Sequence, residues 1–215
     1  MAVTELALLR LLAGTEASSP SLLANLAKAK NVMEQASRFK FHYYHCVEDP
    51  RVIYVIGTWP SVEFHMEQFI PGQPNQEMLA LLKDQVSVEW MFHSAIDQTI
   101  QPLPLGKEMV AIGRHFVKDG DKAAFEATFA RNKHELESFI GGADQVVGGF
   151  RLDTGFDPSL QGERKEEFVL FTGWGSVEEH FAFARTEGFE RYQQIRNHLD
   201  GADIKHAVPL GNPLK

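Results

Sequence analysis

One seven-residue pattern occurs twice in the chain and limits what the chain can fold into. The pattern Trp-x-Ser-Val-Glu-x-His runs from Trp59 to His65, and it returns from Trp174 to His180, 115 residues later. A repeat at such a spacing indicates one structural unit present in two copies, and it decides the architecture before any local detail. The sequence therefore predicts two similar units in tandem.

Weaker matches extend the repeat toward the start of each half. Residues of the first half recur 103 positions later in the pairs Glu5 and Glu108, Leu26 and Phe129, Ala27 and Ala130, Lys30 and Lys133, and Glu34 and Glu137. The larger offset of the Trp motif requires added residues, and the polar stretch 155–167 is expected to be a lengthened hairpin loop, because surface loops accept insertions. The predicted units are residues 1–106 and 107–215.

Hydrophobic periodicity predicts the same order of elements in each half. Apolar residues at helical spacing indicate helices at Pro20–Ser37 and Lys122–Ile140. Ser61 and Ser176 are suited to cap a second helix in each half, and Glu179 completes a capping box with Ser176. The expected strands are 5–12, 40–47, 52–58 and 86–96, then 108–117, 145–154, 167–173 and 203–208. The order is βαββαβ, twice.

This order is that of a ferredoxin-like unit, which is an antiparallel sheet with both helices on one face. Such a unit leaves its other sheet face bare, and an apolar sheet face must be buried against something. A second unit in the same chain supplies the cover. We therefore predict an α+β fold in which two tandem ferredoxin-like βαββαβ units form an intramolecular dimeric α/β-barrel, a pseudo-dimer within one chain.

The segments "GTWPSVEFH" and "TGWGSVEEH" also carry a family resemblance. The chain resembles the dimeric α/β-barrel superfamily, in particular proteins with an antibiotic-biosynthesis monooxygenase (ABM)-like domain, whose members show a Trp ending the third strand and a Ser-led second helix. In that superfamily the two units usually come from two chains. The resemblance implies a cofactor-independent monooxygenase-like enzyme that acts with dioxygen on a small aromatic or polyketide-type molecule, without metal or flavin.

Other functions of the same superfamily stay open. The chain is similar to non-catalytic ligand-binding or stress-response barrels, and to polyketide cyclases or decarboxylases. Haem degradation is disfavoured, because the second-helix regions "NQEMLALLK" and "GFERYQQIR" lack the histidine that haem-degrading relatives carry there.

Histidine is the side chain best suited to act as a base near neutral pH. The candidate catalytic residues are His45, His93 and His65. The candidate substrate-binding residues, with the motif tryptophans as a wall of a cavity between each sheet and its helices, are His42, Tyr43, Tyr44, Trp59, Trp90, His115, Trp174, His180 and His206. Each also has a plain structural interpretation as a core or surface residue. The strands "FHYYHC" and "EWMFHS" favour residues 1–106 as the principal site.

Composition argues against several other classes. A net charge of −8 without a cluster of Lys or Arg disfavours nucleic acid and anionic membranes as partners. No segment approaches the roughly 20 apolar residues that cross a bilayer. The single Cys46 cannot form an internal disulfide, which is typical of a cytoplasmic protein, and no familiar metal-ligand spacing occurs. We expect a small aromatic partner and no cofactor or metal, and association into homo-oligomers stays open.

Overall fold

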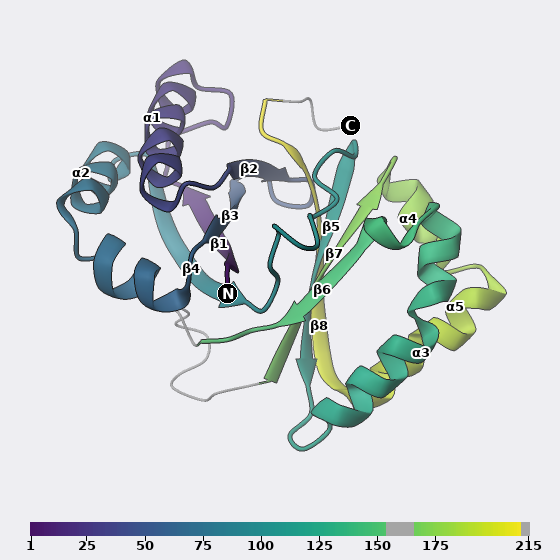
Figure 1. The fold of residues 1–215 in the computed structure, drawn as a ribbon. Helices are drawn as coiled ribbons and strands as arrows, with labels where there is room; N and C mark the ends of the chain where they lie inside the picture. Colours follow the sequence, from purple (N-terminus) through teal and green to yellow (C-terminus); the bar gives the residue numbers. More distant parts are fainter. Residues whose placement is uncertain (154–165, 212–215) are drawn as a thin grey trace.

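The computed structural model describes residues 1–153 and 166–211 (Figure 1). The first unit contains β1 (Val3–Leu11), α1 (Pro20–Ser37), β2 (Phe41–Cys46), β3 (Val52–Trp59), the π-helical segment η1 (Phe64–Phe69), α2 (Gln73–Leu82) and β4 (Val86–Ser94). The second unit contains β5 (Met109–Val117), α3 (Lys122–Ile140), the 3-10 turn η2 (Ala143–Gln145), β6 (Val146–Phe150), β7 (Glu166–Trp174), α4 (Val177–Phe183), α5 (Glu187–Tyr192), the 3-10 segment η4 (Gln193–His198) and β8 (Leu199–Pro209). The predicted α+β fold with two βαββαβ units is confirmed.

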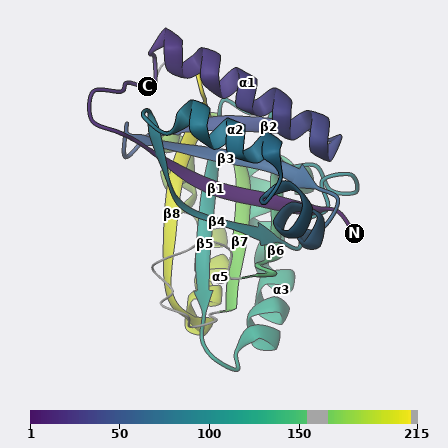
Figure 2. The same ribbon diagram turned by 90° about the vertical axis from the view of Figure 1, so that its left-hand side faces the viewer.

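The eight strands form one antiparallel sheet in the order β4-β1-β3-β2-β8-β5-β7-β6. Strands β2 and β8 join the two units, with Cys46 opposite Ala207. The end strands β4 and β6 meet at an isolated bridge between Ser94 and Arg151, so the sheet closes on itself. The helices lie outside, α1 and α2 over the first unit and α3 to α5 over the second (Figure 1), and the strands of one unit run across those of the other (Figure 2). Closure protects the sheet edges.

Both units fill the interior of this barrel. The apolar residues buried there include Leu6, Tyr54, Ile56 and Phe92 from the first unit and Val110, Val169 and Phe171 from the second. A buried ion network lies beside them, in which Glu167 binds Arg114 and Arg151 at 3.0 Å each. Each unit also has one apolar cluster of its own, which lies between its part of the sheet and its helices. The barrel core therefore exists only where the two units meet.

Strand register defines which residues of the two units are equivalent. Val3 pairs with Trp59 in the first unit, and Met109 pairs with Trp174 in the second. Counting from these pairs, Ala111 is the equivalent of Glu5. The sequence match of Glu5 with Glu108 is therefore wrong by three residues, because local similarity between apolar strands does not fix their register.

The helices show where the sequence prediction held and where it did not. The bounds of α1 and α3 agree with the predicted helices. The predicted second helix of each unit is instead divided in two, into η1 and α2 and into α4 and α5. In the first unit Pro71 lies two residues after the end of η1, and proline cannot continue a helix. In the second unit the Thr186 side chain accepts a hydrogen bond from the Phe189 N–H and caps a new helix.

Residues 155–165 of the expected long loop lie outside the described residues. The last two residues of that stretch, Glu166 and Glu167, belong to β7 instead. Among the residues that the structure describes, none of the helices combines the length and the apolar character that crossing a membrane requires.

Candidate functional site

The repeated motif builds a stacked pair of aromatic rings in each unit. The tryptophan ends β3 or β7, and the histidine six residues later lies in the first helical turns. The rings of Trp59 and His65 stack with centroids 4.1 Å apart, and those of Trp174 and His180 stack at 4.4 Å. The motif serine caps the intervening turn, since Ser176 accepts a hydrogen bond from the Glu179 N–H. The motif therefore positions a histidine against an indole.

A second histidine binds each motif histidine. His65 Nδ1 lies 2.7 Å from Nε2 of His93, which is on β4. His180 Nδ1 lies 2.8 Å from Nε2 of His206, which is on β8. We call His65 and His180 the outer histidines, and His93 and His206 the inner histidines. The same nitrogens meet in both units, so the fold produces the same histidine pair twice.

Each inner histidine is held by a carboxylate from the other unit. His93 Nδ1 lies 2.5 Å from Oδ2 of Asp153, which follows β6 of the second unit. His206 Nδ1 lies 2.5 Å from Oε1 of Glu48, which follows β2 of the first unit. The backbone N–H of each inner histidine also donates to its carboxylate, at 2.9 Å for Asp153 and 3.0 Å for Glu48. Neither set of groups is complete within one unit.

These carboxylates are ionised at neutral pH and set the hydrogen-bond direction. Burial alone would raise the pKa of Asp153 and of Glu48, but hydrogen bonds from the inner histidines lower both pKa values below their ordinary range. A carboxylate accepts the Nδ1–H of the inner histidine, whose Nε2 in the neutral form then accepts from the outer histidine. We infer this tautomer from the network. It leaves Nε2 of the outer histidine without a proton.

The outer histidines are neutral at pH 7. Burial, and next the neighbouring inner histidine, lower the pKa of His65 to about 3 and that of His180 to about 4. A proton accepted at Nε2 is therefore poorly held on the outer ring. The Nδ1 proton can pass to the inner histidine instead, where the carboxylate stabilises the positive charge. The arrangement is suited to act as a base through a proton relay.

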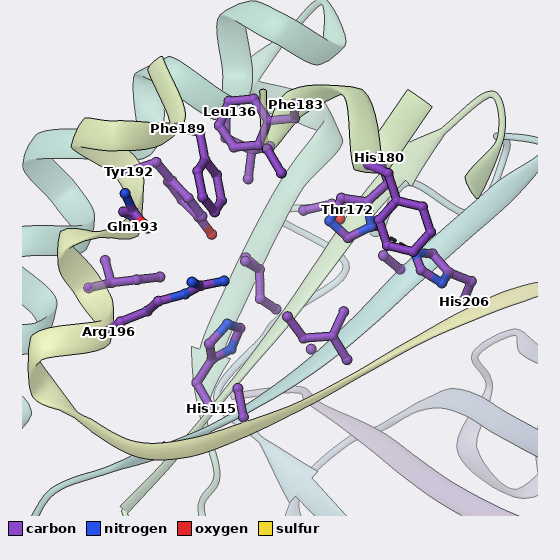
Figure 3. Close-up of a pocket in the computed structure, with 18 of the residues that line it drawn as sticks. His115, Leu136, Thr172, His180, Phe183, Phe189, Tyr192, Gln193, Arg196 and His206 are labelled. Carbon is purple, nitrogen blue, oxygen red and sulfur yellow. Dashed lines mark hydrogen bonds between the residues drawn. The ribbon is translucent and has the colours of Figure 1, made fainter. Parts of the chain in front are cut away.

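The second unit has a cavity of about 440 Å³ between its sheet and helices. His180, His206 and Glu48 line one end of it, so the whole relay borders the cavity (Figure 3). Much of the remaining lining is apolar and includes Leu136, Leu170, Phe183, Phe189 and Ile195. A volume of this size is typical of small-molecule sites.

The equivalent cavity of the first unit is smaller, about 320 Å³, and reaches fewer of the relay groups. His65 lines it but is only 3% exposed, whereas His180 is partly exposed. His93 and Asp153 are not among the residues that line this cavity. The geometry of the second unit therefore gives a ligand better access to the relay.

The first cavity contains a glutamate, Glu5, where the second cavity has Ala111. Glu5 lines the cavity and accepts a hydrogen bond from the indole N–H of Trp59. Burial raises the pKa of Glu5, and the Trp59 hydrogen bond only partly offsets this. In the second unit the Trp174 indole donates instead to Thr172 Oγ1, at 2.7 Å. The two sites are related but chemically different.

The structure separates the other candidate residues from the relay. His45 lies outside both cavities, with Nε2 2.8 Å from the Pro50 carbonyl oxygen. Trp59 and Trp174 are buried behind the outer histidines and do not line the cavities as a wall. Tyr44 and Trp90 face the barrel interior, His42 lines a separate surface hollow, Tyr43 lines the first cavity and His115 lines the second.

Acid should destabilise the protein partly through His115. Burial lowers the pKa of His115 to about 4, and its contact with the Phe168 carbonyl only partly offsets this. Between pH 6.5 and about 4 the unfolded chain binds a proton that the folded state does not, so the free energy of unfolding falls as pH falls. His115→Leu, which introduces the residue of the equivalent position Leu9, should reduce this slope by up to about 1.4 kcal/mol per pH unit.

Urea unfolding across this pH window measures the effect of His115→Leu. His134→Leu is the matched control, because the His134 side chain is 62% exposed, and it should leave the slope unchanged. An identical slope in the wild type and His115→Leu would show that His115 is not held neutral by burial.

Comparisons with known proteins agree with the fold. No protein-family model and no curated protein matches the sequence. A "putative monooxygenase" of Fusobacterium nucleatum has a similar structure, with a TM-score of 0.64 at 10% identity over 97% of this chain and 92% of that one. An anthrone oxidase-like protein has a TM-score of 0.57 at 11% identity, over 96% of this chain and 91% of that one. A mutant chlorite dismutase from Candidatus Nitrospira defluvii has a TM-score of 0.56 at 13% identity, over 97% of this chain and 92% of that one. The chain therefore has the dimeric α/β-barrel fold, as its sequence predicts.

Proposed function

We propose that the second cavity is the active site of a cofactor-independent monooxygenase-like enzyme that acts on a small aromatic or polyketide-type molecule. The observation that carries the proposal is the relay of His180, His206 and Glu48 at the end of an apolar cavity. Such oxygenations begin when a base removes a proton from a phenol or an activated methylene, and the relay is suited to that step.

The relay performs the proton transfers of the reaction. Nε2 of His180 removes a proton from the substrate, its Nδ1 proton moves to His206, and Glu48 stabilises the resulting imidazolium. The substrate anion transfers electrons to dioxygen and forms a carbon–oxygen bond, and the relay returns the proton to the peroxide. For an activated methylene, the base then removes the second hydrogen, the oxygen–oxygen bond breaks, and a carbonyl and one water are the products.

The apolar lining of the cavity supports the same chemistry. Phe183 and Phe189 provide flat rings for an aromatic ligand, and Leu136 adds apolar surface that excludes water. A dry environment strengthens electrostatic interactions with a developing anion and protects a reactive peroxide from side reactions. Phe181 also lines the cavity and is 57% exposed, with its ring 5.7 Å from that of His206. It is placed to cover a bound ligand.

The first cavity is proposed as a second, smaller site. The sequence favours residues 1–106 as the location of the principal site. We instead propose the second unit as the principal site, because His180 is partly exposed and a ligand can reach it. The first site retains its own relay and the additional acid Glu5. Activity of this site should therefore respond to different substitutions from those that affect the second cavity.

Oxygen consumption with a panel of anthrones and phenols tests the proposal. The metal-chelated, flavin-free protein should accelerate dioxygen uptake, and isotope-labelled dioxygen should place one labelled atom in the product carbonyl. Label arriving only from water would overturn the assignment. Tight binding of panel members without any dioxygen uptake would favour a ligand-binding barrel instead.

A further inference from the structure

The end of the second cavity opposite the relay carries a cation. Arg196 lies on η4 and lines the cavity, with Tyr192, Gln193 and His115 around it (Figure 3). Its guanidinium lies 5.3 Å from the centre of the Phe189 ring. Within residues 1–153 and 166–211, no ion pair joins Arg196 to a carboxylate. Arg196 is also exposed, so its charge is open both to solvent and to a ligand in the cavity, and no carboxylate of the described residues is paired with it.

The first cavity carries a cation at the equivalent place. Lys83 lies three residues before the start of β4, as Arg196 lies three residues before the start of β8. The register of the strands supports the equivalence, since Val86 pairs with Leu11 and Leu199 pairs with Val117. Lys83 also lines its cavity. A base at one end and a cation at the other are thus common to both cavities.

We propose that the second cavity binds an aromatic molecule that bears a carboxylate, with the carboxylate on Arg196 and the reacting hydroxyl or methylene at His180. The planar guanidinium can bind both oxygens of a carboxylate, and such charge-assisted pairs are stronger than neutral hydrogen bonds. Glu48 at the relay end repels an anion, so the two ends give the ligand one orientation. The orientation rests on the proposed function, whereas the binding of the carboxylate does not.

The neighbours of Arg196 suit this role. Burial raises the pKa of Tyr192, so its hydroxyl stays protonated and can donate to an anion. Gln193 supplies an amide donor at the same end of the cavity. The aromatic rings of Phe183 and Phe189 lie between this end and the relay, as a planar ligand would require (Figure 3).

Calorimetry with matched ligands tests the proposal near neutral pH and without dioxygen. The probes are 4-hydroxybenzoate, 6-hydroxy-2-naphthoate and 4′-hydroxybiphenyl-4-carboxylate, each compared with its methyl ester. At least one acid should bind the wild type about tenfold or more tightly than its ester, since a hydrogen bond to a charged group contributes that much. The ligand length that gives the largest ratio reports the span between the two ends.

Arg196→Met should reduce the ratio of acid to ester affinity to about one, and Arg196→Lys should keep part of it. The matched control is Arg185→Met, because Arg185 is exposed and does not line the cavity, and it should leave the ratio unchanged. If none of the three acids binds the wild type more tightly than its ester, or if the preference survives in Arg196→Met, the proposal is overturned.

Binding and turnover separate this proposal from the proposed function. His180→Gln should keep the preference for the acid, because it leaves Arg196 in place. A protein that prefers acids but never consumes dioxygen would refute the proposed function alone. A protein that oxygenates neutral substrates without any effect of Arg196→Met would refute the carboxylate site alone.

Discussion

Replacing His180 by Gln should lower turnover about 10²- to 10⁴-fold, the range that a general base contributes. Glutamine keeps a polar group near His206 and the stack on Trp174, but it cannot accept the substrate proton. Initial rates of dioxygen uptake at saturating substrate measure the effect. His65→Gln is the matched control, because it makes the same change in the other unit, and it should reduce turnover far less.

Substitution of the carboxylates tests whether each inner histidine depends on the carboxylate that the other unit supplies. Glu48→Gln should lower turnover in the second cavity by about tenfold to a hundredfold, because the inner histidine loses the charge that stabilises its imidazolium. Asp153→Asn makes the matched change at His93 and should leave that turnover nearly intact. Glu48 acts through His206, so the pH–rate profile should also shift in Glu48→Gln. Larger effects of His65→Gln and Asp153→Asn would return the principal site to residues 1–106, as the sequence favours.

Residues 1–106 expressed alone should not give a monomer that unfolds cooperatively. The barrel interior is built from both units, so the isolated fragment would expose Leu6, Ile56 and Phe92 to water. It would also leave the β2 edge unpaired, since β2 binds β8 in the whole chain. Exposed apolar sheet and free edges lead to association or unfolding. Sedimentation and urea unfolding measure the outcome.

A mixture of residues 1–106 and 107–215 is the control for the fragment experiment. The two fragments should form a folded complex, because each supplies the other with a sheet face, a strand edge and a carboxylate. A monomeric residue 1–106 fragment with a cooperative transition would contradict the account, since the barrel core would then be dispensable.

Much of the fold could be predicted from periodicity. Helices α1 and α3 have the predicted bounds, because their apolar spacing is regular and Gly141, which ends α3, has a positive φ that favours glycine. The division of the second helices was missed, although Pro71 and Pro74 are visible signals for it in the first unit. Register was also missed, since the apolar residues of β1 and β5 resemble each other at more than one offset, and only the pairing with β3 and β7 defines which residues are equivalent.

The candidate site was only partly visible in the sequence. The pairs His65 with His93 and His180 with His206 contain candidates that the repeat had singled out, but the repeat could not show that they touch. Glu48 and Asp153 were missed, because each crosses to the other unit and no spacing along the chain reports that contact. Glu48 lies two residues after the second strand of its unit and Asp153 three residues after that of the other, and an acid repeated near that place was the available signal.

Deuterium exchange into anthrone under anaerobic conditions tests the central claim most directly, because it isolates proton removal from the later reaction with dioxygen. Nuclear magnetic resonance in heavy water follows the loss of the methylene signal. The account predicts that the wild type and His65→Gln accelerate exchange well above buffer, and that His180→Gln reduces the acceleration by about 10²-fold or more. Exchange by His180→Gln as fast as by the wild type would contradict the claim that the relay of the second cavity is the base.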